Sequence, residues 1–324
     1  MKWNKCTSIP EVGKYIIGED DVFVICENKI SSQDELIQLP LQSRSNYNPI
    51  FLTFKHSVFY SNFDRELFKF NSKTNKETKI EEFSGALSSN NKNIFVVVNE
   101  FGTRIIDIEE EVAIREESVR LSSVITSSRF VIGKAGRKGK EVIVIDIKND
   151  SSFNIPLVSK LIQIINVKEE LVVLFYDDGT VNCFDLATKE ELWSLQLVDG
   201  VESHLFSNLL FEENANKVYL LASSYLFELD IKEKICQLAK NYNEESEFEW
   251  YFKDSRLYSD LITFTGANTL GKFPMVAGVI ERSTKEILWT IKCEPGVYFE
   301  EAPQIKDDKL YILDSNKTLH IFEK

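Results

Sequence analysis

Residues 171–197, LVVLFYDDGTVNCFDLATKEELWSLQL, contain the pattern that decides the fold. An alternating apolar run enters a tight turn at Asp177-Asp178-Gly179-Thr180, a second run ends at Asp185, and a short segment carries Trp193. The glycine is typical of a β-hairpin turn, because it tolerates the positive φ that such turns require. β-branched and aromatic residues dominate both runs, so we predict strands in this segment.

The same pattern recurs about eight times along the 324 residues. Aligned on the residue that closes the third strand, the copies end at Ser32, Asn71, Asp107, Asp146, Asp185, Asp230, Glu281 and Phe322. Subtraction gives separations of 39, 36, 39, 39, 45, 51 and 41 residues. A spacing near forty fits four strands of about five or six residues with short turns. The sequence therefore predicts an all-β fold, a β-propeller of four-stranded antiparallel blades, with eight blades favoured and seven as the alternative.

The two ends of the chain look complementary. The last repeat supplies only three strands, and residues 2–9 match the fourth-strand pattern of residues 191–195. We predict that the N-terminal strand completes the last blade and closes the ring, which removes two open sheet edges; a loose N-terminal tail is the alternative. The chain is then one propeller domain over residues 1–324, with the closing strand at 1–10 and blades at approximately 11–41, 46–83, 84–118, 119–157, 160–198, 204–240, 246–293 and 297–324.

The composition is acidic. The formal net charge is −13, which disfavours non-specific binding to nucleic acid or to an anionic membrane. A basic protein partner is favoured instead, although acidity that only keeps the protein soluble is the simpler alternative. We expect another protein as the partner, neither nucleic acid nor membrane, and a monomer apart from that partner.

The cysteines and the start of the chain bear on location. Five cysteines occur singly, at Cys6, Cys26, Cys183, Cys236 and Cys293, which suits buried reduced thiols better than a disulfide framework. The first 30 residues contain no continuous apolar stretch of 7 to 15 residues of the kind a secretory signal needs. We therefore expect a cytoplasmic protein.

Residues 178–193, DGTVNCFDLATKEELW, resemble the repeat of the PQQ-like (quinoprotein alcohol dehydrogenase-like) β-propeller family. That repeat has the pattern D-G-x-[LV]-x-[AC]-[LF]-D-x-x-[TS]-G-[KE]-x-x-W. Residues 281–289, ERSTKEILW, repeat its second half, with Lys285 where the family prefers glycine. The resemblance implies a propeller in which Trp193, Trp289 and Trp3 dock between neighbouring blades.

The redox branch of that family is not expected here. Its quinoprotein dehydrogenases need vicinal cysteines, a calcium site and a much longer chain, and this sequence has no adjacent cysteine pair. The resemblance thus implies the non-catalytic branch and no cofactor.

No catalytic or metal-binding residues emerge from the sequence. The three histidines, His56, His204 and His320, lie in different repeats, and no pair has metal-ligand spacing. His320 alternates within the last strand and is expected to be a packed or edge residue. We expect no enzyme activity.

Strand direction predicts a binding surface. In a four-stranded meander, the connection between the second and third strands and the connection to the next blade emerge at the same end. The long connections belong to this set: 40–49, 133–140, 198–206, 240–249 and 267–274. Long loops tend to carry function, so this end is the predicted binding face. Its candidate partner-binding residues are Arg44, Tyr47, Arg137, Lys138, His204, Glu245, Glu247, Trp250 and Asn268. The alternative for residues 250–252 is the inner strand of the seventh repeat.

Three functions remain open. The favoured one is a non-enzymatic protein-interaction module that binds its partner on the long-loop face, with a bacterial immunity protein that neutralises a toxin as one version. The second is a ligand- or carbohydrate-binding propeller. The third, less favoured, is a propeller hydrolase or lyase with its site at the central channel.

Overall fold

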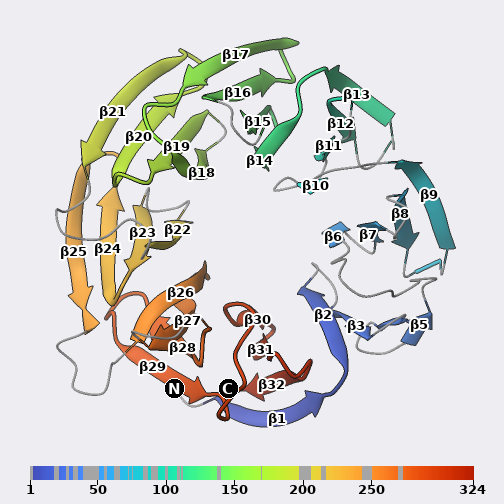
Figure 1. The fold of residues 1–324 in the computed structure, drawn as a ribbon, viewed down its shortest axis with the longest axis vertical. Helices are drawn as coiled ribbons and strands as arrows, with labels where there is room; N and C mark the ends of the chain where they lie inside the picture. Colours follow the sequence, from blue (N-terminus) through green and yellow to red (C-terminus); the bar gives the residue numbers. More distant parts are fainter. Residues whose placement is uncertain are drawn as a thin grey trace. The chain divides into compact units, whose positions relative to one another are not determined.

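The structure is a computed structural model. It describes residues 3–17, 22–26, 29–31, 36–38, 51–54, 57–61, 66–71, 73–74, 76–82, 87–88, 94–98, 101–107, 110, 112–136, 140–168, 170–196, 206–212, 217–242, 250–268 and 273–324. Within these residues, 32 strands form eight four-stranded sheets (Figure 1). Paired strands are antiparallel wherever their register is defined, as alternating apolar runs joined by short turns require.

The chain divides into two compact units. The first unit comprises Met1–Tyr15, Asp177–Val181 and Trp193–Lys324. It holds β1 (Asn4–Ile9), β22 (Phe206–Glu212), β23 (Lys217–Ala222), β24 (Tyr225–Asp230), β25 (Ile235–Asn241), β26 (Trp250–Leu257), β27 (Leu261–Asn268), β28 (Val276–Glu281), β29 (Ile287–Lys292), β30 (Gln304–Lys306), β31 (Lys309–Leu313) and β32 (Leu319–Glu323). Its sheets are β22–β25, β26–β29 and β30–β32 with β1.

The second unit comprises Ile16–Tyr176 and Asn182–Leu192. It holds β6 (Phe51–Phe54), β7 (Ser57–Ser61), β8 (Glu66–Asn71), β9 (Lys76–Glu82), β10 (Leu87–Ser88), β11 (Ile94–Val98), β12 (Thr103–Asp107), β13 (Val112–Glu117), β14 (Leu121–Thr126), β15 (Phe130–Ala135), β16 (Glu141–Asp146) and β17 (Ser151–Pro156). Most of two further sheets also belong to it: β2 (Val12–Ile17), β3 (Val22–Cys26), β4 (Lys29–Ser31) and β5 (Leu36–Gln38), and β18 (Leu161–Lys168), β19 (Leu171–Tyr176), β20 (Thr180–Asp185) and β21 (Glu190–Gln196).

The N-terminal strand completes the last sheet, as predicted. Strand β1 pairs with β32, with Asn4 opposite Glu323 and Ile9 opposite Leu319. Figure 1 shows the two strands side by side in dark blue and red.

The favoured prediction of eight blades is wrong, and the alternative of seven is correct. Seven of the eight sheets have three or four strands of at least four residues, whereas β2–β5 has only two, because β4 and β5 have three residues each. The described fold therefore has seven full blades, and the eighth sheet is a reduced one. The physical reason is strand length, because side chains alternate between the two faces and three residues place only one or two of them on each face.

The cores lie between consecutive sheets. In the second unit, Phe130, Val144, Leu174 and Tyr176 belong to one buried cluster drawn from β14–β17 and β18–β21. In the first unit, Trp3 and Trp289 join a cluster that contains side chains of β26–β29 and of the last sheet, and Trp289 contacts Phe322 with ring centroids 5.1 Å apart. These two tryptophans therefore pack between sheets, as the resemblance implied; Trp193 is also buried.

Each predicted third-strand end from Asn71 to Glu281 is the last residue of its third strand. The carboxylates have a structural role there. Asp185 accepts hydrogen bonds from the backbone N–H groups of Ala187 (2.8 Å) and Thr188 (3.0 Å). Asp230 accepts from the N–H groups of Lys232 and Glu233 in the same way. Asp146 accepts from those of Lys148 and Asn149. Aspartate is typical of this position because its short side chain can close a turn on its own backbone.

Four residues after these ends the backbone is left-handed. The φ angles are 46° at Asp150, 64° at Lys189, 59° at Lys234 and 65° at Lys285. Three of the side chains reach the preceding sheet: Asp150 pairs with Arg115, Lys189 lies over the ring of Phe153, and Lys285 pairs with Glu228 and lies over the ring of Tyr219. Glycine would suit the backbone but could make none of these contacts.

We predict that Lys285→Gly lowers the free energy of unfolding by about 1 kcal/mol, even though glycine relieves the left-handed backbone. The loss arises because Glu228 is buried and would keep only its 3.3 Å ion pair with Lys217. Lys285→Met keeps the left-handed backbone strain and loses the charge. It should therefore lower the free energy of unfolding by roughly 1 kcal/mol more than Lys285→Gly does. Chemical denaturation followed by tryptophan fluorescence measures both variants. A Lys285→Gly protein as stable as the parent would contradict the inter-sheet role of this lysine.

Candidate functional site

Each sheet has two chemically different ends. One end of each sheet holds the start of the first and third strands and the end of the second and fourth strands. We call it the long-loop end, and we call the opposite end the short-loop end. In β26–β29, Trp250 lies opposite Asn268 and Val276 lies opposite Lys292, which places all four at the long-loop end. Within this sheet, the connection between the second and third strands and the connections to the neighbouring sheets therefore emerge at the same end, as predicted.

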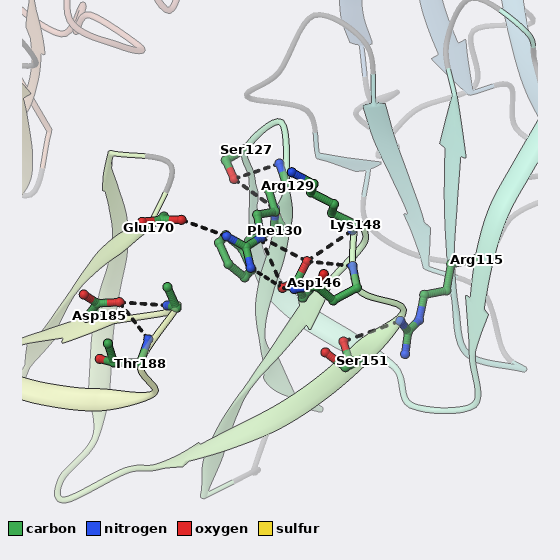
Figure 2. Close-up of polar contacts among 12 residues, drawn as sticks. Arg115, Ser127, Arg129, Phe130, Asp146, Lys148, Ser151, Glu170, Asp185 and Thr188 are labelled. Carbon is green, nitrogen blue, oxygen red and sulfur yellow. Dashed lines mark hydrogen bonds and ion pairs between the residues drawn. The ribbon is translucent and has the colours of Figure 1, made fainter.

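The short-loop ends are closed by internal contacts. In the second unit, the Arg129 guanidinium donates hydrogen bonds to both carboxylate oxygens of Asp146, and its two bonds to Oδ2 measure 2.8 and 3.1 Å. It also donates to the Glu170 carboxylate at 2.7 Å (Figure 2). Asn149 donates its side-chain amide to the same Asp146 carboxylate. Arg129 thus joins two turns of β14–β17 to the first turn of β18–β21.

The charge state of Asp146 follows from these contacts. Burial alone would raise the pKa of the carboxyl group, but hydrogen bonds from Arg129 and from the backbone and side chain of Asn149 outweigh burial and hold the pKa below its usual value. Asp146 is therefore an ionised, fully engaged structural residue.

The long-loop end of β26–β29 exposes aromatic rings. Lys292 Nζ lies 5.1 Å from the centre of the Trp250 ring, and the partly buried Trp250 packs against the core. Phe273, on the connection from β27 to β28, is 57% exposed and stacks on Tyr298 with ring centroids 4.6 Å apart. Ser315 fixes the Tyr298 backbone, since its hydroxyl accepts from the Tyr298 N–H and its own N–H donates to the Tyr298 carbonyl.

Exposed apolar side chains are distributed unevenly between the two ends. Among the described residues, ten large apolar side chains are exposed, and the four that lie in connections are Phe101, Val119, Val158 and Phe273. All four connections belong to the long-loop end of their sheet; the other six side chains lie in strands. The two ends thus differ in chemistry as well as in loop length.

The structure describes two of the nine predicted site residues. Trp250 and Asn268 face each other across β26 and β27. Arg44, Tyr47, Arg137, Lys138, His204, Glu245 and Glu247 lie outside the described residues. Residues 250–252 do begin the first strand of their sheet, and Phe252 is buried, so the inner-strand alternative is correct for this segment. Phe273 and Tyr298 were not predicted; the nearest signal is the pair Phe273-Pro274, an aromatic residue at a strand-breaking proline.

A polar cluster along β26 was also missed. Arg256 pairs with Glu301 at 2.5 Å, Asp254 accepts the Ala302 N–H at 2.8 Å, and the Tyr258 hydroxyl accepts the Ile305 N–H. These contacts tie β26 to the segment that enters β30. The cluster is explained by that attachment.

One trio has the composition of a hydrolase triad. Ser8 Oγ lies 3.2 Å from His320 Nδ1, and His320 Nε2 lies 2.8 Å from Asp314. The ring nitrogens are used in the reverse of the hydrolase order, in which Nε2 faces the serine. Ser8 lies directly opposite His320 on paired strands, and Asp314 also accepts from the Asn316 and Thr318 N–H groups. Strand pairing and turn closure account for all three residues.

Cys236 and Cys293 are not reactive thiolates. Burial raises the pKa of the Cys236 thiol to about 11, and burial with the charge of Asp314 raises that of Cys293 to about 12, so neither is a thiolate at neutral pH. Among the described residues, no group of three or more His, Cys, Asp and Glu side chains could hold a metal ion. Nor does that part of the chain contain a helix long and apolar enough to cross a membrane.

Solved structures share the fold at low sequence identity. The designed protein Ika8 matches 97% of this chain and 96% of its own, with a TM-score of 0.71 and 15% identity. BamB from Moraxella catarrhalis matches over 100% of both chains (0.61, 9%). The β-propeller domain of Cps50 (Swd1) from Myceliophteria thermophila matches 87% of this chain and 98% of its own (0.58, 11%).

These likenesses identify the class of fold, a β-propeller. No family model and no curated protein matches the chain.

We predict that Arg129→Ala lowers the free energy of unfolding by roughly 2–3 kcal/mol at pH 7, because it leaves the buried Asp146 carboxylate without its cation. The contribution of Asp146 is complete above the unfolded carboxyl pKa of about 3.9 and is lost as pH falls through the lower folded value. The difference between parent and variant should therefore narrow below about pH 4. Denaturation at a series of pH values checks this.

Lys309→Ala is the matched control for this experiment, since it removes an exposed ion pair with Glu323. It should change stability by less than about 1 kcal/mol. An Arg129→Ala deficit that stays constant down to pH 3 would show that Asp146 ionisation is not involved.

Proposed function

We propose that this chain is a protein-interaction module that binds a protein partner at the long-loop ends of its sheets. One observation carries the proposal: the exposed large apolar side chains of the described connections all lie at those ends. Exposed apolar residues on loops held by a rigid scaffold are typical of binding surfaces.

The aromatic group in the first unit has the features of a binding hot spot. Phe273 and Tyr298 are held against each other before any partner arrives, so little side-chain freedom is lost on binding. Trp250 and Asn268 lie at the long-loop end of the same sheet, and Lys292 keeps a cation at the indole face. These residues supply apolar area and hydrogen-bonding groups together.

Several finer proposals accompany this one. The net charge of −13 supports a basic partner, and an immunity protein that neutralises a basic toxin is the version we keep. A monomeric, cytoplasmic protein without catalytic activity or cofactor remains our prediction from the sequence. Membership of the PQQ-like repeat family is supported by the Asp185 turn, by the packing of Trp289, and by the propeller fold of the structural neighbours. A carbohydrate ligand is the second candidate, since the exposed Phe273, held against Tyr298, could stack on a sugar ring.

The decisive test pairs this chain with the protein encoded by the adjacent reading frame. We expect the two to co-purify and Phe273→Ser to weaken their binding by about thirty-fold, the effect of losing one hot-spot residue of about 2 kcal/mol. Ile235→Ser is the control, because Ile235 is equally exposed but lies on the outer strand β25. Calorimetric titration measures both affinities.

Both variants should keep the thermal midpoint of the parent, because exposed side chains add little to stability. Equal binding by the parent and Phe273→Ser would contradict the long-loop assignment. Binding of a glycan that depends on Phe273, without any protein partner, would favour the second candidate.

A further inference from the structure

The long-loop end of β10–β13 in the second unit presents an apolar pair. Phe101 is 80% exposed and precedes Gly102, whose φ is 155° and where a Cβ atom would lie 1.9 Å from the Glu117 carbonyl oxygen. Next to them the Thr103 hydroxyl donates to the Val119 carbonyl at 2.6 Å and accepts from the Leu121 N–H. The Phe101 turn is therefore fixed against the 118–121 connection, and both Phe101 and Val119 remain exposed.

The same connection leads into a row of cations on the next sheet. The Gly136 N–H donates to the Arg120 carbonyl at 2.8 Å, and the Leu157 N–H donates to the Lys140 carbonyl at 2.7 Å. Arg120 and Lys140 thus lie at the long-loop end of β14–β17, and exposed Val158 and Lys160 follow in the connection to β18. The first and fourth strands of a sheet are about 15 Å apart, so these side chains line a surface of that width.

The charges on this surface are available to a partner. In the described part of the chain, no carboxylate forms an ion pair with Arg120, Lys140 or Lys160. Two nearby carboxylates are already engaged, Glu117 by Arg115 and Glu141 by the Asn154 amide. A chain with a net charge of −13 therefore presents here a locally cationic surface with apolar side chains.

We propose that Phe101, Val119, Arg120, Lys140, Val158 and Lys160, the cationic apolar patch, bind an acidic segment of a protein partner. One apolar side chain of that segment would pack on Phe101 and Val119, a second would reach Val158 at the other edge of the surface, and carboxylates between and beside them would pair with the three cations. The inference rests on the proposed function and specifies the partner chemistry at one long-loop end. For this surface, the partner segment is acidic, whereas the net charge of the chain favours a basic partner.

Charge complementarity selects this occupant. Three exposed cations beside exposed apolar side chains favour a segment that offers both carboxylates and apolar groups, because each alone gives little affinity in water. Five residues of extended chain span about 16 Å, which matches the width of the surface. Nucleic acid and anionic vesicles would meet the same cations but also the repulsion of the remaining acidic surface.

The test selects twelve-residue peptides from a random displayed library on the full chain. Affinities of the enriched peptides are then measured by fluorescence polarisation against the parent chain, against Phe273→Ser and against four further variants. Arg120→Glu/Lys140→Glu reverses the patch, and Lys73→Glu/Lys148→Glu makes the same charge change on exposed lysines of short-loop turns. Phe101→Ser removes the anchor surface, and Ile114→Ser removes an equally apolar residue from outer strand β13.

We expect enriched peptides to carry net negative charge around a Phe, Leu or Trp. Their Kd should rise at least ten-fold for Arg120→Glu/Lys140→Glu and for Phe101→Ser, stay within two-fold for both controls, and rise with salt. Absence of enrichment, neutral or basic peptides, or equal loss in the control variants would overturn the proposal. So would a twenty-nucleotide DNA or a phosphatidylserine vesicle that binds with the same dependence on Arg120 and Lys140.

The same measurements separate this inference from the proposed function. Peptides whose binding is lost in Phe273→Ser but kept in Arg120→Glu/Lys140→Glu would contradict the cationic apolar patch as the binding site. The proposed binding at the long-loop ends would still hold. Peptides indifferent to both changes would bind elsewhere, and the proposed function itself would fail.

Discussion

The hydrogen bonds that close each third strand govern the rest of the structure. A carboxylate such as that of Asp185 or Asp230 accepts hydrogen bonds from two backbone N–H groups that would otherwise need water as their acceptor. These bonds fix a four-residue turn. The turn obliges the residue four positions later to adopt a left-handed conformation. That residue then projects its side chain onto the preceding sheet, as Asp150 and Lys189 do. One local interaction thereby sets the hairpin, the period of the repeat and the attachment between neighbouring sheets.

This arrangement explains why lysine and not glycine occupies position 285. A glycine at position 285 would avoid roughly 1–2 kcal/mol of backbone cost, yet the sequence has lysine. Because Glu228 is buried on the preceding sheet, the lysine gains an ion pair that offsets the strain. The short-loop ends are therefore closed twice, by turns within a sheet and by side chains between sheets.

The elements predicted best from the sequence depend on local signals. The third-strand ends from Asn71 to Glu281 were placed correctly, because a carboxylate or amide after an alternating run closes its own turn. The N-terminal strand was placed correctly, since an incomplete last repeat leaves an open edge. The number of full blades was overestimated at β2–β5, where equal spacing concealed strands of only three residues. The Arg129 contacts and the Phe273–Tyr298 stack join residues 17, 41 and 25 positions apart, and no local pattern reveals such pairs.

The difference between net charge and local charge decides what a partner experiences. A net charge of −13 is a sum over 51 acidic and 38 basic residues, whereas surface charges act over a screening length of about 8 Å. An acidic segment near Arg120 and Lys140 therefore meets mainly those cations and few of the distant carboxylates. Elsewhere the excess of carboxylates repels the same segment, which suppresses binding in wrong positions. In the proposed complex, an acidic chain with a cationic apolar patch would gain specificity from both attraction and repulsion.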